Sequence, residues 1–353
     1  KGDDPGMSMN RQWLLAHTPS EGLPLADDFE WRESAVPDPG PRQLLSQTIY
    51  LSLDPYQWGR RRRGLETPGE VCHGRTVAWV LKSNLPGYVE GDFLFNTNGW
   101  QSHGLTGMGI SVFTYMLPRK IDPGVAPLST AIGVLGMLGL TAYSGLVVQC
   151  QPKAGETVVV SAASGGVGQV VGQIAKILGC RVVGIAGREE KCAFVTNELG
   201  FDACVSHLGD DLSGALGAAC PDGIDIYFEN VGGKCFEAVL QHLNRKSRVT
   251  RCGLISQYGN MDGRDAFEVW EGMGQAVFEK QDCGVFPLAV GNFVADHQDE
   301  FLARMADWLR DDKVKYLEDI RADLENTPET FRAMLEGGNF GKTMMQVSVD
   351  PTK

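Results

Sequence analysis

The sequence lacks three things that would each narrow its class: an excess of positive charge, a long uninterrupted apolar run and paired cysteines. Its 353 residues hold 32 Lys and Arg against 44 Asp and Glu, and this net charge of −12 argues against nucleic acid or anionic membranes as partners. The apolar stretch at 131–148 is interrupted by glycines and is shorter than a membrane span. Nine scattered cysteines without a Cys-x-x-Cys pair, and no secretory signal, lead us to expect a cytoplasmic protein with reduced thiols.

The length suits two domains rather than one small core. Residues 1–6 have the composition of an expression remnant, and we leave them out of the fold. From 10 to about 130, short strand-like segments separated by prolines indicate a loop-rich β domain. From about 133 to 300, strand and helix patterns alternate, as in a parallel sheet covered on both faces. A closing strand at 343–349 has no partner in its own segment, so we expect it to return to the N-terminal domain.

A glycine-rich turn follows the apolar run 157–160, which is typical of a buried parallel strand. The turn, AASGGVG at 162–168, has the spacing of a dinucleotide fingerprint, with Ala163 in the first glycine place. Gly165 would let the backbone approach a pyrophosphate, and Gly168 would let the next helix lie against the strand. A turn without a ligand is the alternative for this motif taken alone.

The segment after the turn completes a βαβ unit, with a helix predicted over 170–178 and a strand over 181–186. In this fingerprint an acidic residue beyond the second strand holds a ribose 2′-hydroxyl, whereas a basic residue accommodates a 2′-phosphate. Gly187 and Arg188 end the strand here and Lys191 follows, which favours NADPH.

Two neighbouring features leave that cofactor choice open. Glu189 and Glu190 stand between the basic residues and argue mildly for NADH, or the four charged residues are simply a solvated helix start. His207 follows the next predicted strand, 202–205, and is either a further phosphate contact or a loop histidine.

Six short motifs in order resemble the medium-chain dehydrogenase/reductase superfamily. They are similar to its zinc-independent branch, which contains leukotriene B4 12-hydroxydehydrogenase (prostaglandin reductase), alkenal double-bond reductases and NADPH-dependent curcumin reductases. The motifs are YLSLDPY at 50–56, GWQ at 99–101, GLTAY at 139–143, YFENVGG at 227–233, CGLISQY at 252–258 and NFGK at 339–342.

The resemblance implies an α/β protein with a GroES-like β domain and a doubly wound Rossmann domain. The first would comprise 7–132 and 309–353, and the second 133–308. It also implies a homodimer that uses NADPH to reduce the C=C bond of α,β-unsaturated ketones or aldehydes. The expected cofactor contacts are Ala163, Gly165, Gly166, Val167, Gly168, Gly187, Arg188, Lys191, His207, Asn230, Tyr258 and Asn339.

Tyr258 is the predicted catalytic residue. Enone reduction needs a hydride at the β-carbon, stabilised charge on the enolate oxygen and a proton at the α-carbon; NADPH supplies the hydride. A tyrosine hydroxyl, with an ordinary pKa of about 10, stays protonated near neutral pH. Tyr258 follows a strand predicted over 248–256, and open α/β sheets bind ligands at the carboxyl ends of strands. In the alternative, Tyr258 packs under the cofactor and a ribose hydroxyl carries the enolate charge.

The predicted substrate pocket is lined by aromatic residues, of which Tyr56 and Trp100 are equally typical of plain packing. These residues are Tyr56, Trp58, Trp100 and Phe286. Where relatives continue with Met-Arg after the tyrosine, this chain has Gln57-Trp58-Gly59 and four arginines, 60–63. We interpret the arginine run as solvated surface, with a clamp for an acidic substrate or a CoA phosphate as the alternative.

Other functions have weaker support in the sequence. A zinc alcohol dehydrogenase needs Cys, His and Glu ligands, and only Cys72-His73 resembles them, in a segment expected to be a strand. We therefore expect no metal. A quinone oxidoreductase, an NADP-dependent dehydrogenase of an allylic hydroxyl and a non-catalytic NADPH-binding sensor stay open as alternatives.

Overall fold

The computed structural model describes residues 9–20, 22–112, 115–260 and 263–353, so the expected remnant at 1–6 lies outside the described residues. The chain forms two compact units. The β unit comprises the residues as far as Ile132 together with Asp319–Gly338 and Thr343–Lys353, and the α/β unit comprises Gly133–Glu318 and Asn339–Lys342. The boundary predicted at 308 falls inside a helix that ends at Arg310, and the units divide after Glu318 instead.

The β unit is built on a mostly antiparallel sheet with the order β14-β15-β3-β4-β5-β7, in which β6 also pairs with β3. A separate two-stranded ribbon joins β1 to β2. The strands are β1 (Met9–Leu15), β2 (Phe29–Ala35), β3 (Gln43–Ser52), β4 (Thr76–Ser83), β5 (Phe93–Asn96), β6 (His103–Gly107), β7 (Arg119–Ile121), β14 (Glu318–Ala322) and β15 (Lys342–Gln346). Met344 of β15 lies opposite Ser52 of β3, which confirms that the closing strand returns to this unit.

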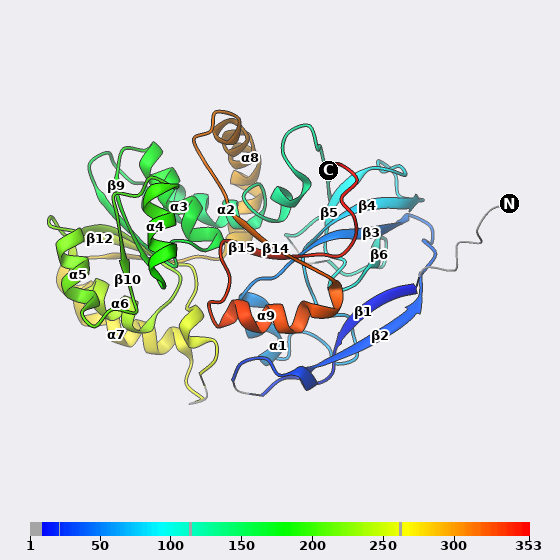
Figure 1. Ribbon diagram of the computed structural model, residues 1–353, viewed down its shortest axis with the longest axis horizontal. Coiled ribbons are helices and arrows are strands. Elements are labelled where there is room, and N and C mark those ends of the chain that lie inside the picture. The colour runs from blue at the N-terminus through cyan, green and yellow to red at the C-terminus, as the bar shows by residue number, and fades with distance from the viewer. Residues whose placement is uncertain (1–8, 21, 113–114, 261–262) are drawn as a thin grey trace. The chain divides into compact units, whose positions relative to one another are not determined.

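Two helices complete the core of the β unit, α1 (Tyr56–Arg62) and α9 (Thr327–Leu335). In Figure 1 the orange α9 lies beside the blue α1. Phe331 of α9 packs edge-on against Trp58 of α1, with ring centroids 6.4 Å apart, and against Trp100, at 5.4 Å. The C-terminal part of the chain therefore supplies core side chains to the N-terminal strands.

The α/β unit holds a six-stranded parallel sheet with the order β10-β9-β8-β11-β12-β13. Its strands are β8 (Thr157–Ser161), β9 (Arg181–Ala186), β10 (Ala203–Ser206), β11 (Ile224–Glu229), β12 (Leu243–Arg251) and β13 (Gly284–Pro287). This order reverses between β8 and β11, as in a doubly wound Rossmann sheet, and ligands bind at such a reversal. The predicted fold class is confirmed.

Helices surround this sheet, as the green and yellow ribbons of Figure 1 show. They are α2 (Met137–Tyr143), α3 (Gly166–Ile177), α4 (Glu189–Asn197), α5 (Leu212–Ala219), α6 (Gly233–Leu240), α7 (Ala266–Gln281) and α8 (Val294–Arg310). The valines at 158–160 in β8 are fully buried, because helices cover both faces of the central strand. This burial explains the continuous β-branched run in the sequence.

One predicted strand is displaced. The sequence predicts a strand over 248–256, whereas β12 runs from Leu243 to Arg251. Glu229, the last residue of β11, pairs with Arg251, so β12 ends where its neighbouring strand ends. The backbone N–H groups of Cys252 and Gly253 both donate to the Glu229 carbonyl. A short 3-10 turn, Ile255–Gln257, then leads to Tyr258.

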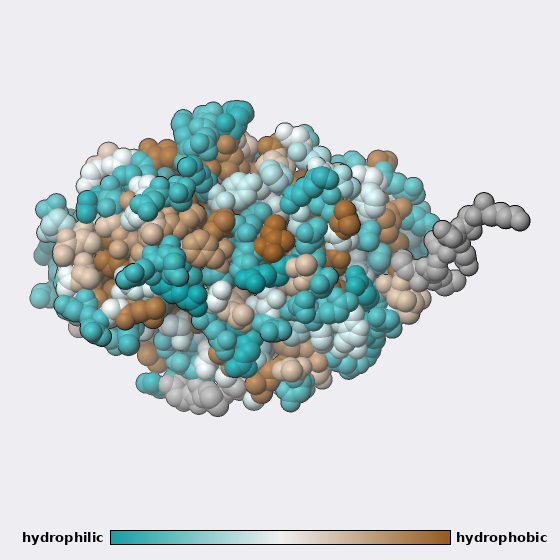
Figure 2. Space-filling view, viewed as in Figure 1, coloured by the Kyte–Doolittle hydropathy of each residue, from teal (hydrophilic) through white to brown (hydrophobic). Residues whose placement is uncertain are grey.

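The surface is mixed. Large exposed apolar side chains include Leu25, Leu65, Val89 and Leu208, and Figure 2 shows brown residues dispersed among hydrophilic ones on the face that it draws. Within the described ranges, no helix combines the length and apolar character needed to cross a membrane.

Candidate functional site

The glycine turn lies between β8 and α3, at the point where the sheet order reverses. Gly165 is the N-cap of α3. Because glycine has no side chain, the cap provides no side-chain acceptor for the first backbone N–H groups of the helix. A Cβ on Gly168 would lie 2.2 Å from the carbonyl oxygen of Ala162, so only glycine fits this close approach of helix to strand. A helix N-terminus with uncapped N–H groups is suited to a phosphate group.

A segment from the end of the chain borders the same turn. Gly341 forms a parallel bridge with Gly165, and the Phe340 ring packs against Phe194 of α4 at a centroid distance of 5.1 Å. The Asn339 amide donates to the carbonyl of Gly341 at 2.9 Å, which fixes its side chain in this segment. The structure thus brings Asn339 close to the predicted pyrophosphate loop, across more than 170 residues of sequence.

Asn230 lies at the carboxyl end of β11, next to the end of β8. Its backbone N–H donates to the Ser161 hydroxyl and its side-chain amide donates to the Ser161 carbonyl, both at 2.8 Å. These two bonds join the loops that follow β8 and β11, which are the two strands at the reversal.

A buried carboxylate holds the second loop in place. Glu229 is fully buried, and its Oε1 accepts from the Tyr227 hydroxyl at 2.8 Å and from the backbone N–H groups of Val231 and Gly232 at 2.8 and 2.9 Å. Ser161 also donates to Oε1, at 3.1 Å, and the Trp270 indole donates to Oε2 at 3.0 Å. Sequence analysis missed Glu229, although an acidic residue that ends a buried apolar strand is an available signal.

Basic residues gather at the end of β9. Arg188 is the exposed N-cap of α4, and a Cβ on Gly187 would lie 3.4 Å from Nε2 of His207. Burial lowers the pKa of His207, and the charges of Lys191 and Lys234 lower it further. The structure therefore brings the predicted Gly187, Arg188, Lys191 and His207 into one region.

Two members of this region were missed by sequence analysis. The Ser206 hydroxyl donates to the carbonyl of Gly187 and so ties the end of β10 to the end of β9. Lys234, near the start of α6, is distant in sequence and has no motif that marks it.

Tyr258 lies on the turn that follows β12, and this turn is hydrogen-bonded to the loop that follows β11. Its hydroxyl accepts a hydrogen bond from the backbone N–H of Leu254 at 3.3 Å. The hydroxyl oxygen also lies close to Gly253, because a Cβ on that glycine would be only 3.1 Å away from it. The backbone N–H groups of Ile255 and Ser256 donate to the carbonyls of Asn230 and Val231, which anchors the turn that carries the tyrosine. Phe286, in the edge strand β13, is half-buried.

Tyr56 pairs with His73. The tyrosine hydroxyl and Nε2 of His73 are 2.8 Å apart. Burial raises the pKa of Tyr56 above its ordinary value. Burial, together with the charges of Arg60, Arg61 and Arg75, lowers the pKa of His73 to about 3. Both side chains are therefore neutral near pH 7 and present hydrogen-bonding groups without charge.

The two tryptophans of the predicted substrate pocket are core residues of the β unit. The Trp58 side chain is 1% exposed and its indole N–H donates to the Gly22 carbonyl at 2.8 Å. Trp100 is 0% exposed and stacks on Phe29 with ring centroids 5.2 Å apart. Their assignment to a substrate pocket stays a prediction, and this burial does not support it.

The interpretation of the arginine run as solvated surface is wrong for Arg61. Its side chain is fully buried, its guanidinium lies 4.3 Å from the Trp100 ring centroid, and its Nε is 3.1 Å from Oε2 of Glu66. Its Nη2 donates to the carbonyl of His73 at 3.2 Å. Arg63 is exposed. Helix α1 and its C-cap cause the difference, because residues two positions apart in an α-helix, such as Arg61 and Arg63, lie on nearly opposite sides.

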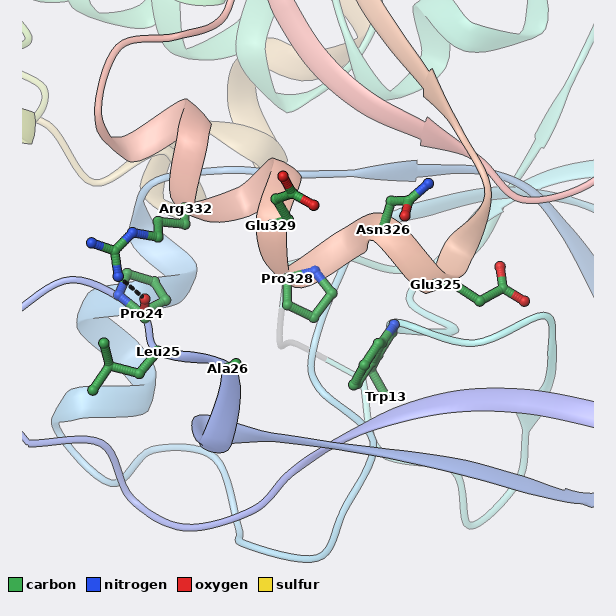
Figure 3. Close-up of a pocket in the computed structure, with 9 residues that line it drawn as sticks. All are labelled: Trp13, Pro24, Leu25, Ala26, Glu325, Asn326, Pro328, Glu329 and Arg332. Carbon is green, nitrogen blue, oxygen red and sulfur yellow. Dashed lines mark hydrogen bonds between the residues drawn. The ribbon is translucent and has the colours of Figure 1, made fainter.

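A pocket of about 390 Å³ lies within the β unit, shown in Figure 3. Arg332 in this pocket donates to the Pro24 carbonyl at 2.8 Å, and Trp13 donates to the Leu324 carbonyl at 2.8 Å. None of the predicted site residues lines it. Its lining comprises Trp13, Pro24, Leu25, Ala26, Glu325, Asn326, Pro328, Glu329 and Arg332.

Among the residues that the structure describes, no three His, Cys, Asp or Glu side chains are grouped so that they could hold a metal ion. Cys72 and His73 precede β4 rather than lying in a strand as expected. Cys72 belongs to the core of the β unit, and His73 contacts Tyr56.

Comparison with known proteins identifies the family. Residues 166–272 match the family described as "Zinc-binding dehydrogenase", and residues 11–110 match "N-terminal domain of oxidoreductase". The chain is 42% identical over 349 residues to the NADPH-dependent curcumin reductase of Escherichia coli (strain K12), with 97% of this chain and 98% of the relative covered. The chain belongs to the medium-chain dehydrogenase/reductase family.

Further similar proteins support the same family assignment. The NADP(+)-dependent 2-alkenal reductase of Nicotiana tabacum is 37% identical over 360 residues, covering 96% of this chain and 98% of the relative. The solved structure of CurA from Vibrio vulnificus in complex with NADPH is 39% identical, with a TM-score of 0.86 and coverage of 96% of this chain and all of that chain. The protein is an NADPH-dependent oxidoreductase of the curcumin, alkenal and prostaglandin reductase type.

The residues present fit NADPH. The uncapped start of α3 and the close approach at Gly168 suit a pyrophosphate, and the basic residues at the end of β9 suit a 2′-phosphate. NADPH fits because these loops offer hydrogen-bond donors to its phosphate groups and leave room for the backbone to approach them.

Proposed function

We propose that this protein reduces the carbon–carbon double bond of α,β-unsaturated ketones and aldehydes. The observation that carries the proposal is the position of Tyr258 on a turn bonded to the Asn230–Val231 loop, at the carboxyl edge of the sheet. The names of the relatives, curcumin reductase and 2-alkenal reductase, support the same substrate class.

The proposed division of labour follows the needs of the reaction. NADPH, when bound, supplies the hydride to the β-carbon. The glycine turn and the start of α3 hold its pyrophosphate. Asn230 and Asn339 lie along its nicotinamide side, as the family resemblance implies. The Tyr258 hydroxyl donates a hydrogen bond to the substrate carbonyl oxygen, where negative charge develops. A solvent proton completes the α-carbon.

The substrate that we propose is neutral. Tyr56 and Phe286 are retained as substrate contacts, and the Tyr56–His73 pair carries no charge near pH 7 because burial opposes ionisation of both groups. The Arg61 guanidinium forms an ion pair with Glu66 and packs on the ring of Trp100, so we expect it not to bind a substrate. These contacts favour an aryl or alkyl enone over a substrate that needs an arginine clamp.

The test is the identity of the product. Reduced protein is incubated with NADPH and 4-phenyl-3-buten-2-one, and the product is identified by NMR. We expect the saturated ketone. An allylic alcohol would show carbonyl reduction and overturn the proposal. No product across a panel of enones, with NADPH binding intact, would favour the non-catalytic alternative.

We also retain two earlier expectations, a homodimer, which the family resemblance implies, and a cytoplasmic location, which the scattered cysteines favour. Both are separate from the proposed chemistry.

A further inference from the structure

Two thiols of the α/β unit lie in contact. The sulfur of Cys204, in β10, donates its S–H to the sulfur of Cys192, in α4, at 3.1 Å. Both residues are half-buried and both thiols are free. A disulfide has an S–S length of about 2.05 Å, so about 1 Å of approach separates this pair from a covalent bond.

The thiol pair adjoins the basic region at the end of β9. The backbone N–H of Cys192 donates to the carbonyl of Arg188 at 3.2 Å, and Lys191 is its sequence neighbour. Cys204 stands two residues before Ser206, which is bonded to Gly187. A shift of α4 against β10 therefore moves the groups assigned to the 2′-phosphate.

The same pair also borders the glycine turn. A Cβ on Gly184 would lie 3.2 Å from the sulfur of Cys204 and 2.7 Å from the Cβ of Ala163. The sulfur of Cys204 and the first residue of the fingerprint thus pack on one glycine of β9.

The two cysteines have different chemistry. The hydrogen bond from Cys204 lowers the pKa of Cys192, and the same bond together with burial raises the pKa of Cys204. Cys192 also lies near the N-terminus of α4, which favours a thiolate. Cys192 is thus the nucleophile, and Cys204 is the resolving thiol.

We propose that Cys192 and Cys204 form an oxidisable pair, which a peroxide converts into a disulfide that weakens binding of the NADPH 2′-phosphate. The Cys192 thiolate attacks one peroxide oxygen and forms a sulfenic acid, and hydroxide leaves. The sulfur of Cys204 then attacks Cys192, the S–S bond forms and water leaves. In total two thiols lose two electrons and two protons, and hydrogen peroxide is reduced to two waters. The effect on NADPH rests on the proposed 2′-phosphate contacts.

The test treats the reduced, full-length protein with stoichiometric hydrogen peroxide. Peptide mass mapping without reductant is expected to show a Cys192–Cys204 disulfide. Fluorescence titration is expected to show a Kd for NADPH about tenfold higher, as for the loss of one charge-assisted hydrogen bond. The Kd for NADH is expected to stay unchanged, and dithiothreitol is expected to restore the original values.

Variants separate the pair from other thiols. Cys192→Ser and Cys204→Ser are expected to lose the response, whereas Cys283→Ser, a half-buried thiol that contacts Ser247, is expected to keep it. Peptide mass mapping of the peroxide-treated wild-type protein tests for the disulfide directly, even where a variant folds poorly. Absence of the cross-link, or a cross-link with unchanged NADPH binding, would overturn the proposal. These titrations need no turnover, so failure of enone reduction is recorded separately.

Discussion

The Tyr258 hydroxyl accepts the backbone N–H of Leu254, and the ring is carried on the turn that follows β12. Phenylalanine at this position keeps the ring and removes only the hydroxyl. We expect Tyr258→Phe to leave the Kd for NADPH nearly unchanged and to lower kcat for an aryl enone by about 10²-fold, the usual effect of losing one hydrogen-bond donor to a developing negative charge. Stopped-flow or steady-state kinetics with a fluorescence titration measures both quantities.

The matched control is Tyr88→Phe, which removes a hydroxyl from the small apolar cluster of the β unit. It is expected to leave kcat unchanged. Equal turnover of Tyr258→Phe and wild-type protein would remove Tyr258 from the mechanism and favour the ribose hydroxyl.

Arg188 and Lys191 belong to the basic region at the end of β9. Replacing both by Ala is expected to raise the Kd for NADPH by about tenfold or more, because charge-assisted hydrogen bonds to a phosphate are lost. The Kd for NADH is expected to change little, since NADH has no 2′-phosphate. Equal weakening of both cofactors would contradict the assignment of this region.

At the residue scale, the sequence predicted best where the reason is local. Gly168 is required by an approach to Ala162, only six residues earlier. Trp58 is different, because it is buried against Phe331, which is distant in sequence. The residues near Trp58 in the sequence do not predict that contact. Arg61 was assigned to the surface for the same reason, since its aromatic neighbours Phe29, Trp100 and Phe331 are spread along the chain.

Among the elements, β8 and β11 are joined at their carboxyl ends through Glu229. Glu229→Gln exchanges one acceptor oxygen for a donor amide, which then faces groups that already donate. We expect the free energy of unfolding to fall by about 1–3 kcal/mol, the cost of a buried unsatisfied donor. We also expect weaker NADPH binding, because the loop of Asn230 loses its anchor. Urea denaturation and fluorescence titration measure the two effects.

Glu237→Gln in α6 serves as the control, because the Glu237 side chain is exposed. It is expected to leave both measurements unchanged. A Glu229→Gln variant with wild-type stability and NADPH affinity would show that the carboxylate is dispensable for the loop.

The hydrophobic pattern of the sequence predicted the boundaries of an element correctly where those boundaries depend only on the residues of that element. The predicted strand 181–186 coincides with β9. The predicted helix 170–178 begins four residues late relative to α3, because the first turn of α3 contains Gly166 and Gly168. The end of β12 was misplaced because its pairing with the neighbouring strand β11, which ends at Glu229, decides it. A pattern in one segment does not contain that information.

For the molecule as a whole, His73 predicts how stability depends on pH. Its pKa is about 3 in the folded protein and about 6.5 when unfolded, so between these values the unfolded chain binds more protons. Stability is therefore lost as the pH falls from about 6.5 towards 3, by up to about 1.4 kcal/mol per pH unit from this one group. We expect His73→Gln to show a shallower decline in urea denaturation between pH 6.5 and 4.5.

Other charged groups surround His73, namely Arg60, Arg61, Arg75, Asp54 and Glu66. The comparison of wild type with His73→Gln removes their shared contribution. Parallel pH profiles for the two proteins would contradict a buried, neutral imidazole.

The pairing of β15 with β3 has a consequence for synthesis on the ribosome. Ser52 emerges from the ribosome long before its partner Met344. Until then the end of β3, Tyr50–Ser52, lacks this partner and has open backbone N–H and C=O groups, which are a template for aggregation. The strands of the α/β unit, from Thr157 to Pro287, are all made before that moment. The nascent chain therefore passes through a stage in which its later half is able to fold while its earlier half waits for its last strand.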